Sequence, residues 1–420
     1  MIASDALRRG LASMRRPSWL TKASLLITGT AQDPVAFVAK LRDEDPVFWI
    51  PYYEAWLVTR HDDVRALFAD ARVTTDARAY ERHIPSGIAG AARWLGAMPF
   101  RSMQSDPQSV PRRLAMGVLT PRAVERTEER IREVVEQCAA PLRSRSDVVD
   151  LMTEFTTPIS TMAIGRILGV PPKGADEIRF RQLAVKATRG IRPFLSDEKR
   201  LKSERSAVEM CEYVSELVRE RRREPADDMI SDLLGASRAT SSDEIDDVVR
   251  IVAALVSAGT GTVGTACARA LRTLLLHPAQ LCQLRSDRSL LPNAVDELLR
   301  YDSGLAVVPR YALEDFELRG RAIKKGQLVA PCILAANRDP DVFTDPDRLD
   351  LGRDCRQALS FGYGPHYCTG TGIARIEMRL MLDAALDFLP PRARLLTDQI
   401  RWSARGMMAQ IRSLPVDFGA

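Results

Sequence analysis

The sequence predicts a mainly α-helical protein with a minor β region, folded as a single large domain. From about residue 120 onward, apolar residues recur at three- and four-residue spacing, a pattern typical of amphipathic helices. Short runs rich in β-branched and aromatic residues occur near residue 50 and again between residues 305 and 335. No long low-complexity linker separates these regions, so strands from both parts of the chain are expected to share one domain, residues 32–420.

The chain starts with a basic segment, residues 1–31, in which Asp5 is the only acidic residue. A transit peptide or an interfacial helix is one interpretation of this N-terminal leader, and a mobile or surface-packed leader is the other. Two strands are predicted next, at Val47–Ile50 and Ala55–Thr59, and a helix is predicted from Asp62.

Helical spacing is clearest in residues 122–142 and 204–224. Residues 305–335 then predict short strands within "LAVVPRY", "FELRGRAI" and "QLVAPCIL". A final long helix is expected just after Cys368, where apolar residues from Ile373 to Ala384 follow one stripe.

Composition excludes several classes of protein. The formal net charge of +5 is mild for 420 residues and does not indicate nucleic-acid binding. The seven cysteines are widely spaced, odd in number and without a C-x-x-C pair, which favours a reducing, cytoplasmic location and disfavours a zinc site. Residues 251–268 carry no charge but are rich in small residues, so a buried helix is predicted there rather than a membrane span.

A glycine-rich loop, "SFGYGPHYCTGTG", surrounds Cys368. Such a cluster of glycines needs a reason, because glycine loses more conformational entropy on folding than any other residue. The cysteine is expected at a helix N-terminus, where unpaired N–H groups favour a thiolate. A buried inert thiol, a metal ligand and a nucleophile with His366 as its base all remain open from these local features.

The same loop resembles the haem-binding loop of the cytochrome P450 superfamily. The match includes Phe361, Gly362, His366, Cys368 and Gly370. The resemblance implies the single-domain fold of that family, with haem b (iron protoporphyrin IX) as cofactor and a long central helix crossing it. It also implies that Cys368 is the thiolate ligand of the iron, that Phe361 packs near the sulfur, and that His366 reaches a haem propionate.

Other family motifs follow in the expected order. Glu297 and Arg300 resemble the E-x-x-R helix motif. Arg348 in "DPDRLD" has the position of a third arginine that, in the family, completes a buried Glu–Arg–Arg network. Arg310 and Arg112 resemble arginines that bind the haem propionates. In the family a histidine precedes the second of these by four residues, whereas this chain has Gln108, which can still donate a hydrogen bond.

The uncharged helix departs from the family pattern A-G-x-[Asp/Glu]-T. This chain has Ala258, Gly259, Thr260, Gly261 and Thr262, so the threonine is present and the acid is absent. The resemblance places Ala258 against the haem and assigns Thr260, Gly261 and Thr262 to the oxygen-activation site. Close helix packing or a bulge over the haem would each explain the glycines. We hypothesise that Thr260, a substrate group or a wider water channel replaces the missing acid.

Family position also suggests the lining of a substrate pocket, although an apolar residue at such a place is as often plain core. The suggested residues are Trp94, Leu95, Met98, Ala254, Ala258, Val307, Val308, Met407 and Met408. An apolar, medium-sized substrate is expected, such as a terpenoid, steroid, fatty acid or polyketide.

The function that the resemblance implies is hydroxylation or epoxidation with O2 and two electrons from a ferredoxin and its reductase, by a protein expected to be a monomer. Arg113, Arg375 and Arg379 are candidates for a basic ferredoxin-docking surface, or are simply solvated helix charges. The alternatives are a peroxide-using or O2-independent haem-thiolate enzyme, and a non-catalytic haem or ligand-binding protein.

Overall fold

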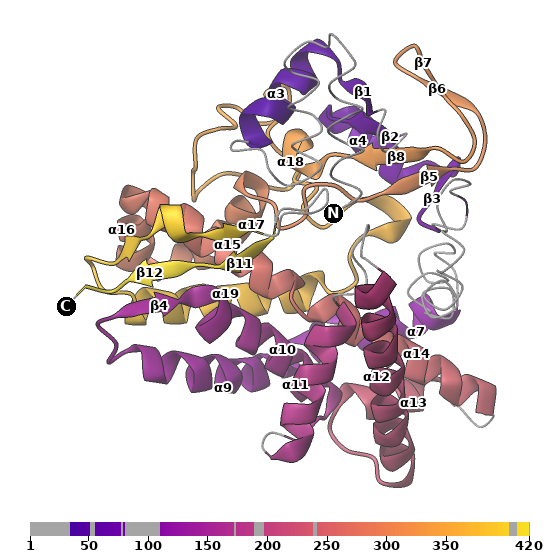
Figure 1. Cartoon of the computed structure of the whole chain (residues 1–420), viewed down its shortest axis with the longest axis vertical. Helices are drawn as coiled ribbons and strands as arrows, with labels where there is room; N and C mark the ends of the chain where they lie inside the picture. Colours follow the sequence, from indigo (N-terminus) through magenta and orange to yellow (C-terminus); the bar gives the residue numbers. More distant parts are fainter. Residues whose placement is uncertain are drawn as a thin grey trace.

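The computed structural model describes residues 34–50, 55–76, 79, 110–171, 174–188, 197–237, 242–402 and 410–419. Helices dominate these ranges and the strands are short, which confirms the predicted fold class (Figure 1). The leader, residues 1–31, lies outside the described residues.

The largest sheet joins the two β regions that the sequence predicted. Its strand order is β1 (Val47–Ile50), β2 (Ala55–Val58), β8 (Leu328–Pro331), β5 (Arg310–Ala312) and β3 (Val73–Thr74). β2 and β8 are parallel, with Ala55 opposite Leu328, and the other neighbouring pairs are antiparallel. Segments almost 300 residues apart in the sequence therefore complete one sheet.

Two details near this sheet differ from the prediction. The run "QLVAPCIL" leaves the strand after Pro331 and turns into a short helix, α18 (Ile333–Ala336). The run "FELRGRAI" is a hairpin of β6 (Phe316–Leu318) and β7 (Arg321–Ile323). Its two turn residues, Arg319 and Gly320, have φ of 46° and 73°, which suits the right-handed twist of paired strands.

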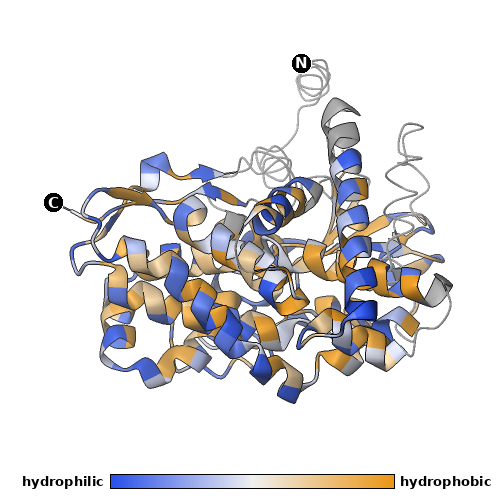
Figure 2. Ribbon diagram, turned by 90° about the horizontal axis from the view of Figure 1, so that it is seen from below, coloured by the Kyte–Doolittle hydropathy of each residue, from blue (hydrophilic) through white to orange (hydrophobic). Residues whose placement is uncertain are grey.

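The helices form most of the remaining body, and most of those in Figure 2 carry both hydrophobic and hydrophilic residues. Their bounds are α3 (Pro34–Glu44), α4 (His61–Ala69), α7 (Val110–Val118), α8 (Pro121–Arg126), α9 (Glu128–Ala139), α10 (Thr157–Leu168), α11 (Ala175–Thr188), α12 (Asp197–Arg223), α13 (Met229–Ser237), α14 (Ser242–Gly259), α15 (Thr262–Leu276), α16 (Pro278–Ser286), α17 (Leu291–Tyr301) and α19 (Thr371–Phe388). Residues of α9, α10, α15 and α19 share one hydrophobic core.

The chain's last strand closes this core. β12 (Pro415–Asp417) pairs with β4 (Val148–Asp150) and with β9 (Arg394–Leu395). A two-stranded ribbon of β10 (Arg401–Trp402) and β11 (Ile411–Ser413) leads into it. Leu414, Val416 and Phe418 are completely buried, so the C-terminal segment belongs to the interior.

The uncharged run forms two helices, α14 and α15, separated at Thr260 and Gly261. Together, Ile245–Leu276 are long and apolar enough to cross a membrane, but 67% of the most apolar window is buried inside the protein. Gly261 has φ of 89°, in the left-handed region that glycine adopts without strain. The predicted bulge is therefore a complete break of the helix.

Candidate functional site

The loop that carries Cys368 lies between a short 3-10 turn, Gly364–His366, and the start of α19. The Cys368 N–H donates to the Phe361 carbonyl at 3.0 Å, which folds the loop back on itself. Gly362 and Gly364 have φ of 76° and 70°. A Cβ atom on Gly364 would lie 3.2 Å from the Ala69 Cβ, so this glycine also allows the loop to approach α4.

The electrostatic balance at Cys368 differs from the prediction. Burial of the sulfur raises the pKa of the Cys368 thiol, although the residue as a whole is exposed on one side. The Gly370 N–H and the Thr371 hydroxyl act in the opposite direction, as do Arg112 and Arg375. The helix N-terminus therefore favours the thiolate but does not outweigh the effect of burial on the pKa. A cation facing the open side of the sulfur would be needed to lower the pKa of the thiol.

Three basic side chains converge beside this loop without a carboxylate among the described residues to neutralise them. Arg310 is 4% exposed, and burial lowers the pKa of its guanidinium to about 10. Burial and the charges of Arg310 and Arg112 lower the pKa of His366 to about 4. The buried Nδ1 of His366 has no hydrogen-bond partner. Arg112 donates to the Tyr367 carbonyl at 3.0 Å.

The break between α14 and α15 leaves two hydroxyls in different situations. The Thr262 hydroxyl donates to the Ala258 carbonyl at 2.6 Å, across the break. The Thr260 hydroxyl is buried and has no partner. A Cβ on Gly261 would meet nothing within 4 Å, so the position of the missing acid faces open space.

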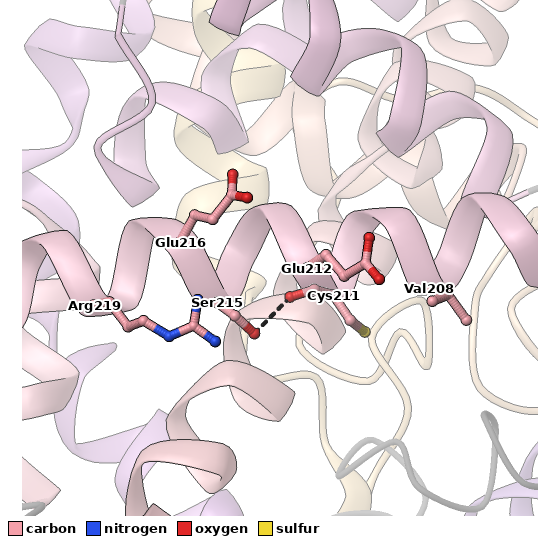
Figure 3. A pocket seen from close by; sticks show the side chains of 6 residues that line it. All are labelled: Val208, Cys211, Glu212, Ser215, Glu216 and Arg219. Carbon is pink, nitrogen blue, oxygen red and sulfur yellow. Dashed lines mark hydrogen bonds between the residues drawn. The ribbon is translucent and has the colours of Figure 1, made fainter.

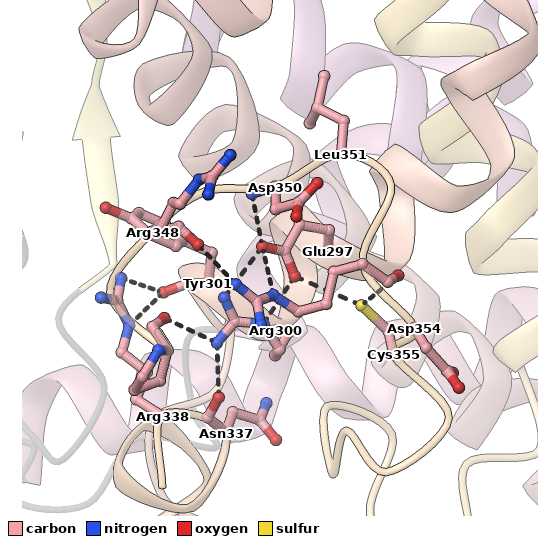
Figure 4. A network of polar contacts seen from close by, with 12 residues as sticks. Glu297, Arg300, Tyr301, Asn337, Arg338, Arg348, Asp350, Leu351, Asp354 and Cys355 are labelled. Atoms are coloured by element: carbon pink, nitrogen blue, oxygen red, sulfur yellow. Dashed lines mark hydrogen bonds and ion pairs between the residues drawn. The ribbon is translucent and has the colours of Figure 1, made fainter. Parts of the chain in front are cut away.

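Glu297 is the centre of a buried polar network (Figure 4). It is fully buried and accepts hydrogen bonds from Arg300 at 2.6 and 3.0 Å. Arg353 approaches the same carboxylate at 3.2 Å, and the Asp350 N–H donates to it at 3.0 Å. The Cys355 thiol lies 3.4 Å away. Arg300 also donates to the carbonyls of Asn337 and Pro346, which ties α17 to the loop beyond α18.

The assignment of Arg348 to this network is wrong, because Arg353 takes that place. Arg348 is exposed, and its side chain points away from Glu297 in Figure 4. Its carbonyl accepts a hydrogen bond from Arg353 at 3.1 Å. The motif "DPDRLDLGR" offers two arginines, and only the path of the loop decides which one turns inward.

The structure describes only part of the suggested substrate pocket. Ala254 and Val307 are buried, and Ala258 and Val308 are half-buried. Val307 also packs in a core cluster with Cys332 and forms an isolated bridge to it, so the plain-core interpretation holds for this residue. The other suggested positions lie outside the described residues, as does Gln108: Trp94, Leu95, Met98, Met407 and Met408.

Two of the arginines proposed for partner docking carry an acidic partner of this chain. Arg375 contacts Asp296 at 2.8 Å, and Arg379 contacts Glu128 at 2.7 Å. Arg375 also lies over the Phe361 ring, 4.9 Å from its centre. The positive charges of these two arginines are therefore partly neutralised by carboxylates of this chain.

An open groove of about 360 Å³ runs along the outer side of α12 (Figure 3). It is lined by Val208, Cys211, Glu212, Ser215, Glu216 and Arg219, none of which belongs to the loop around Cys368. Within the described ranges, no group of three or more His, Cys, Asp or Glu side chains is arranged to hold a metal ion.

The donor set fits a haem held by a single cysteine. Cys368 presents a sulfur open on one side, and Arg310, Arg112 and His366 supply cationic and N–H groups that suit two carboxylates. A Cβ on Gly370 would lie 4.0 Å from the Cys368 sulfur, so this glycine leaves the space beside the sulfur without a side chain. These are the features that a haem-thiolate site requires.

Comparison with known proteins identifies the family. The family model described as Cytochrome P450 matches residues 177–387. Cytochrome P450 107B1 of Saccharopolyspora erythraea is 32% identical over 399 residues, covering 93% of this chain and 96% of its own length. Mycinamicin IV hydroxylase/epoxidase of Micromonospora griseorubida is 33% identical, with 90% and 94% covered. The solved structure of PksS, the cytochrome P450 of the bacillaene polyketide synthase of Bacillus subtilis 168, has a TM-score of 0.80 and 28% identity, with 92% and 97% covered.

The chain belongs to the cytochrome P450 family, and it is a P450 monooxygenase. The family implies a haem cofactor. The predicted superfamily and fold are confirmed.

Proposed function

We propose that this chain uses haem b, O2 and two electrons from a ferredoxin and its reductase to hydroxylate or epoxidise an apolar, medium-sized small molecule. Each turnover converts substrate, O2, two electrons and two protons into oxygenated product and one water. The single observation that carries the proposal is Cys368, a sulfur open on one side and next to three basic side chains that have no carboxylate partner among the described residues. The printed names of the relatives, a hydroxylase/epoxidase and a polyketide-synthase P450, support a polyketide or similar substrate.

The chain's own residues would act as follows. Cys368 would ligate the iron, while Arg112, Arg310 and His366 would hold the haem carboxylates. Haem with a thiolate ligand supplies the activation of dioxygen, since the sulfur donates electron density that favours O–O cleavage.

The break between α14 and α15 would supply the groups that hold and move protons. The Thr262 hydroxyl is oriented by its bond to the Ala258 carbonyl, so its oxygen lone pairs remain available to accept from water or substrate. Ala254 and Val308 are candidates to line the substrate side of this space. We also propose that the protein is soluble, cytoplasmic and monomeric.

The test is the absorption spectrum of the reduced, CO-bound protein. Thiolate ligation shifts the Soret band strongly to the red, and Cys368→Ala should abolish that band. An unshifted band in the wild type, or no haem at all, would reject the proposal. The control is Cys282→Ala, which removes another exposed thiol and should leave the band unchanged.

A second candidate function has one observation in its favour, the absence of an acid at Gly261. An enzyme that uses peroxide, or that rearranges an oxygenated substrate without O2, needs no proton relay to dioxygen. Turnover with hydrogen peroxide alone, compared with turnover with ferredoxin, reductase and NADPH, separates the two. A non-catalytic haem or ligand-binding protein would give no product with either supply.

A further inference from the structure

Helix α4 supports the glycine-rich loop that carries the cysteine. It contacts the turn Gly364–His366, and a Cβ atom on Gly364 would lie 3.3 Å from the Phe68 carbonyl. One turn earlier, Arg65 donates to the Tyr363 hydroxyl at 3.0 Å, and its guanidinium carbon lies 4.4 Å from the centre of that ring. The last two turns of α4 therefore hold this loop from one side.

The same helix also contacts Arg310, the buried arginine of β5. The Arg310 guanidinium carbon lies over the Phe68 ring, 4.9 Å from its centre. Both side chains are buried, Phe68 at 2% and Arg310 at 4% exposure. Arg310 also donates to the Pro309 carbonyl at 3.1 Å, but no carboxylate pairs with it within the described ranges. The ring face and one backbone carbonyl are thus the electronegative groups that these ranges offer to the buried charge.

An aromatic ring at position 68 does more for this charge than an aliphatic side chain would. Burial disfavours the charged guanidinium and lowers the pKa of Arg310 to about 10. The face of a ring attracts a cation, and the attraction is stronger when both groups are shielded from water. Most members of the core cluster around Phe68 are aliphatic, such as Val64, Leu67 and Ile333. A leucine would fill much of the same space but would offer no such face.

We propose that Phe68 is a positioning residue for the haem, because its ring holds the Arg310 guanidinium by a cation–π contact in the orientation that binds a haem carboxylate. Phe68 acts through Arg310 and through the backbone contact of its own helical turn with the cysteine loop. Without the ring face, the guanidinium would turn toward water, and haem binding would include the cost of ordering it again. The inference rests on the proposed function, since it requires a haem held at Cys368.

The test weakens the ring face while nearly keeping the shape of the side chain. Mono-, di- and trifluorinated phenylalanines are incorporated at Phe68 of the full chain, and transfer of haem from the loaded protein to apomyoglobin is timed. Each fluorine withdraws electron density from the face, so transfer should become faster stepwise, by roughly two- to fivefold over the series. The matched control is the same series at Phe155, which is buried and packs edge-on against Phe388, and it should leave the rate unchanged.

Repeating the series in Arg310→Met separates the cation–π contact from packing. Methionine is a flexible apolar side chain without the charge. Haem should leave this variant faster than it leaves the wild type, and fluorination at Phe68 should no longer change the rate. A dependence on fluorination that persists in Arg310→Met, or no dependence in the wild-type background, would overturn the inference.

A spectroscopic measurement decides if Arg310→Met retains no haem. The bending band of the haem propionates in the resonance Raman spectrum follows their hydrogen bonds. It should therefore shift with fluorination at Phe68 and stay in place with fluorination at Phe155. A ring that served only packing would change the Tm without moving this band, so an unshifted band overturns the inference.

The outcomes also separate the inference from the proposed function. If the reduced, CO-bound wild type shows no red-shifted Soret band, the monooxygenase proposal fails. If that band is red-shifted and haem transfer does not depend on fluorination at Phe68, the positioning role alone is wrong.

Discussion

The choice between Arg353 and Arg348 as the third member of the Glu297 network can be tested directly by comparing two single substitutions. Arg353 donates to the Glu297 carboxylate at 3.2 Å and to three backbone carbonyls, those of Thr344, Asp345 and Arg348, at 2.6 to 3.1 Å. Its side chain is 11% exposed. Arg348→Ala is the matched control, since it removes an exposed arginine from the same loop.

The magnitude follows from these contacts. A buried hydrogen bond to a charged group contributes about 1.5–3 kcal/mol, whereas the three carbonyls that accept from Arg353 lie at the exposed side of the loop and can bond water in its absence. Glu297 keeps Arg300 as a partner, so the charge is not left unpaired and the larger cost of breaking a buried pair is avoided. Arg353→Ala is therefore expected to destabilise the protein by about 3 kcal/mol, and Arg348→Ala by no more than about 0.5 kcal/mol.

Thermal unfolding of the haem-loaded variants, side by side at equal concentration, measures the difference. At about 2 cal/mol/K of unfolding entropy per residue, 3 kcal/mol lowers the Tm of a chain of this length by roughly 3–4 °C. The control should shift by less than about 1 °C. If Arg348→Ala lowers the Tm as much as Arg353→Ala does, the loop path described above is wrong.

Gly261→Asp should raise the coupling of electron use to product formation. The substitution adds a backbone strain of about 1–2 kcal/mol, because φ at this position is 89°. Gly261→Ala carries the same strain without the acid, so equal coupling in the two variants would reject the hypothesis that this site lacks an acid. Arg310→Ala should speed transfer of haem to apomyoglobin, whereas Arg356→Ala, an exposed arginine paired only with Asp354, should not; equal rates in both would remove Arg310 from the haem site. Because folding raises the pKa of Glu377 from 4.5 to about 8, the folded state binds a proton that the unfolded state has lost between these values, and stability falls as pH rises across that window. Urea unfolding at several pH values should show a loss of at most about 5 kcal/mol that is smaller in Glu377→Gln, and identical slopes in the two proteins would contradict the raised pKa.

Local patterns predicted most of the secondary structure because they depend on neighbours in the sequence. β-Branched and aromatic residues at Val47–Ile50 predicted β1, and the apolar stripe after Cys368 predicted α19. The same patterns did not reveal that Ile333 and Leu334 leave the strand for a helix, since both residues are apolar and buried, as residues of a core strand would also be.

Properties that depend on the surroundings in space were harder to predict. The pKa of Cys368 was expected to fall at a helix N-terminus, but the burial of the sulfur, which no local motif encodes, outweighs the nearby N–H donors. The Oε1 atom of the buried Glu377 has no hydrogen-bond partner. The sequence could not predict this, because it does not show that the neighbouring Arg375 and Arg379 are directed to other acids. In the sequence alone, R-I-E-M-R looks like an ordinary run of solvated helix charges.

The pairing of β12 with β4 has a consequence for how the protein is made. The Leu151 N–H donates to the Leu414 carbonyl, and the Leu414 N–H donates to the Asp150 carboxylate, so residues about 260 positions apart are held together. During synthesis, helices α9 and α10 emerge long before the segment that completes their interior. Until the segment with Val416 and Phe418 has left the ribosome, the nascent chain presents apolar surface that these two residues would cover. A stop codon placed before Leu414 should therefore yield aggregated or degraded protein rather than a shortened enzyme.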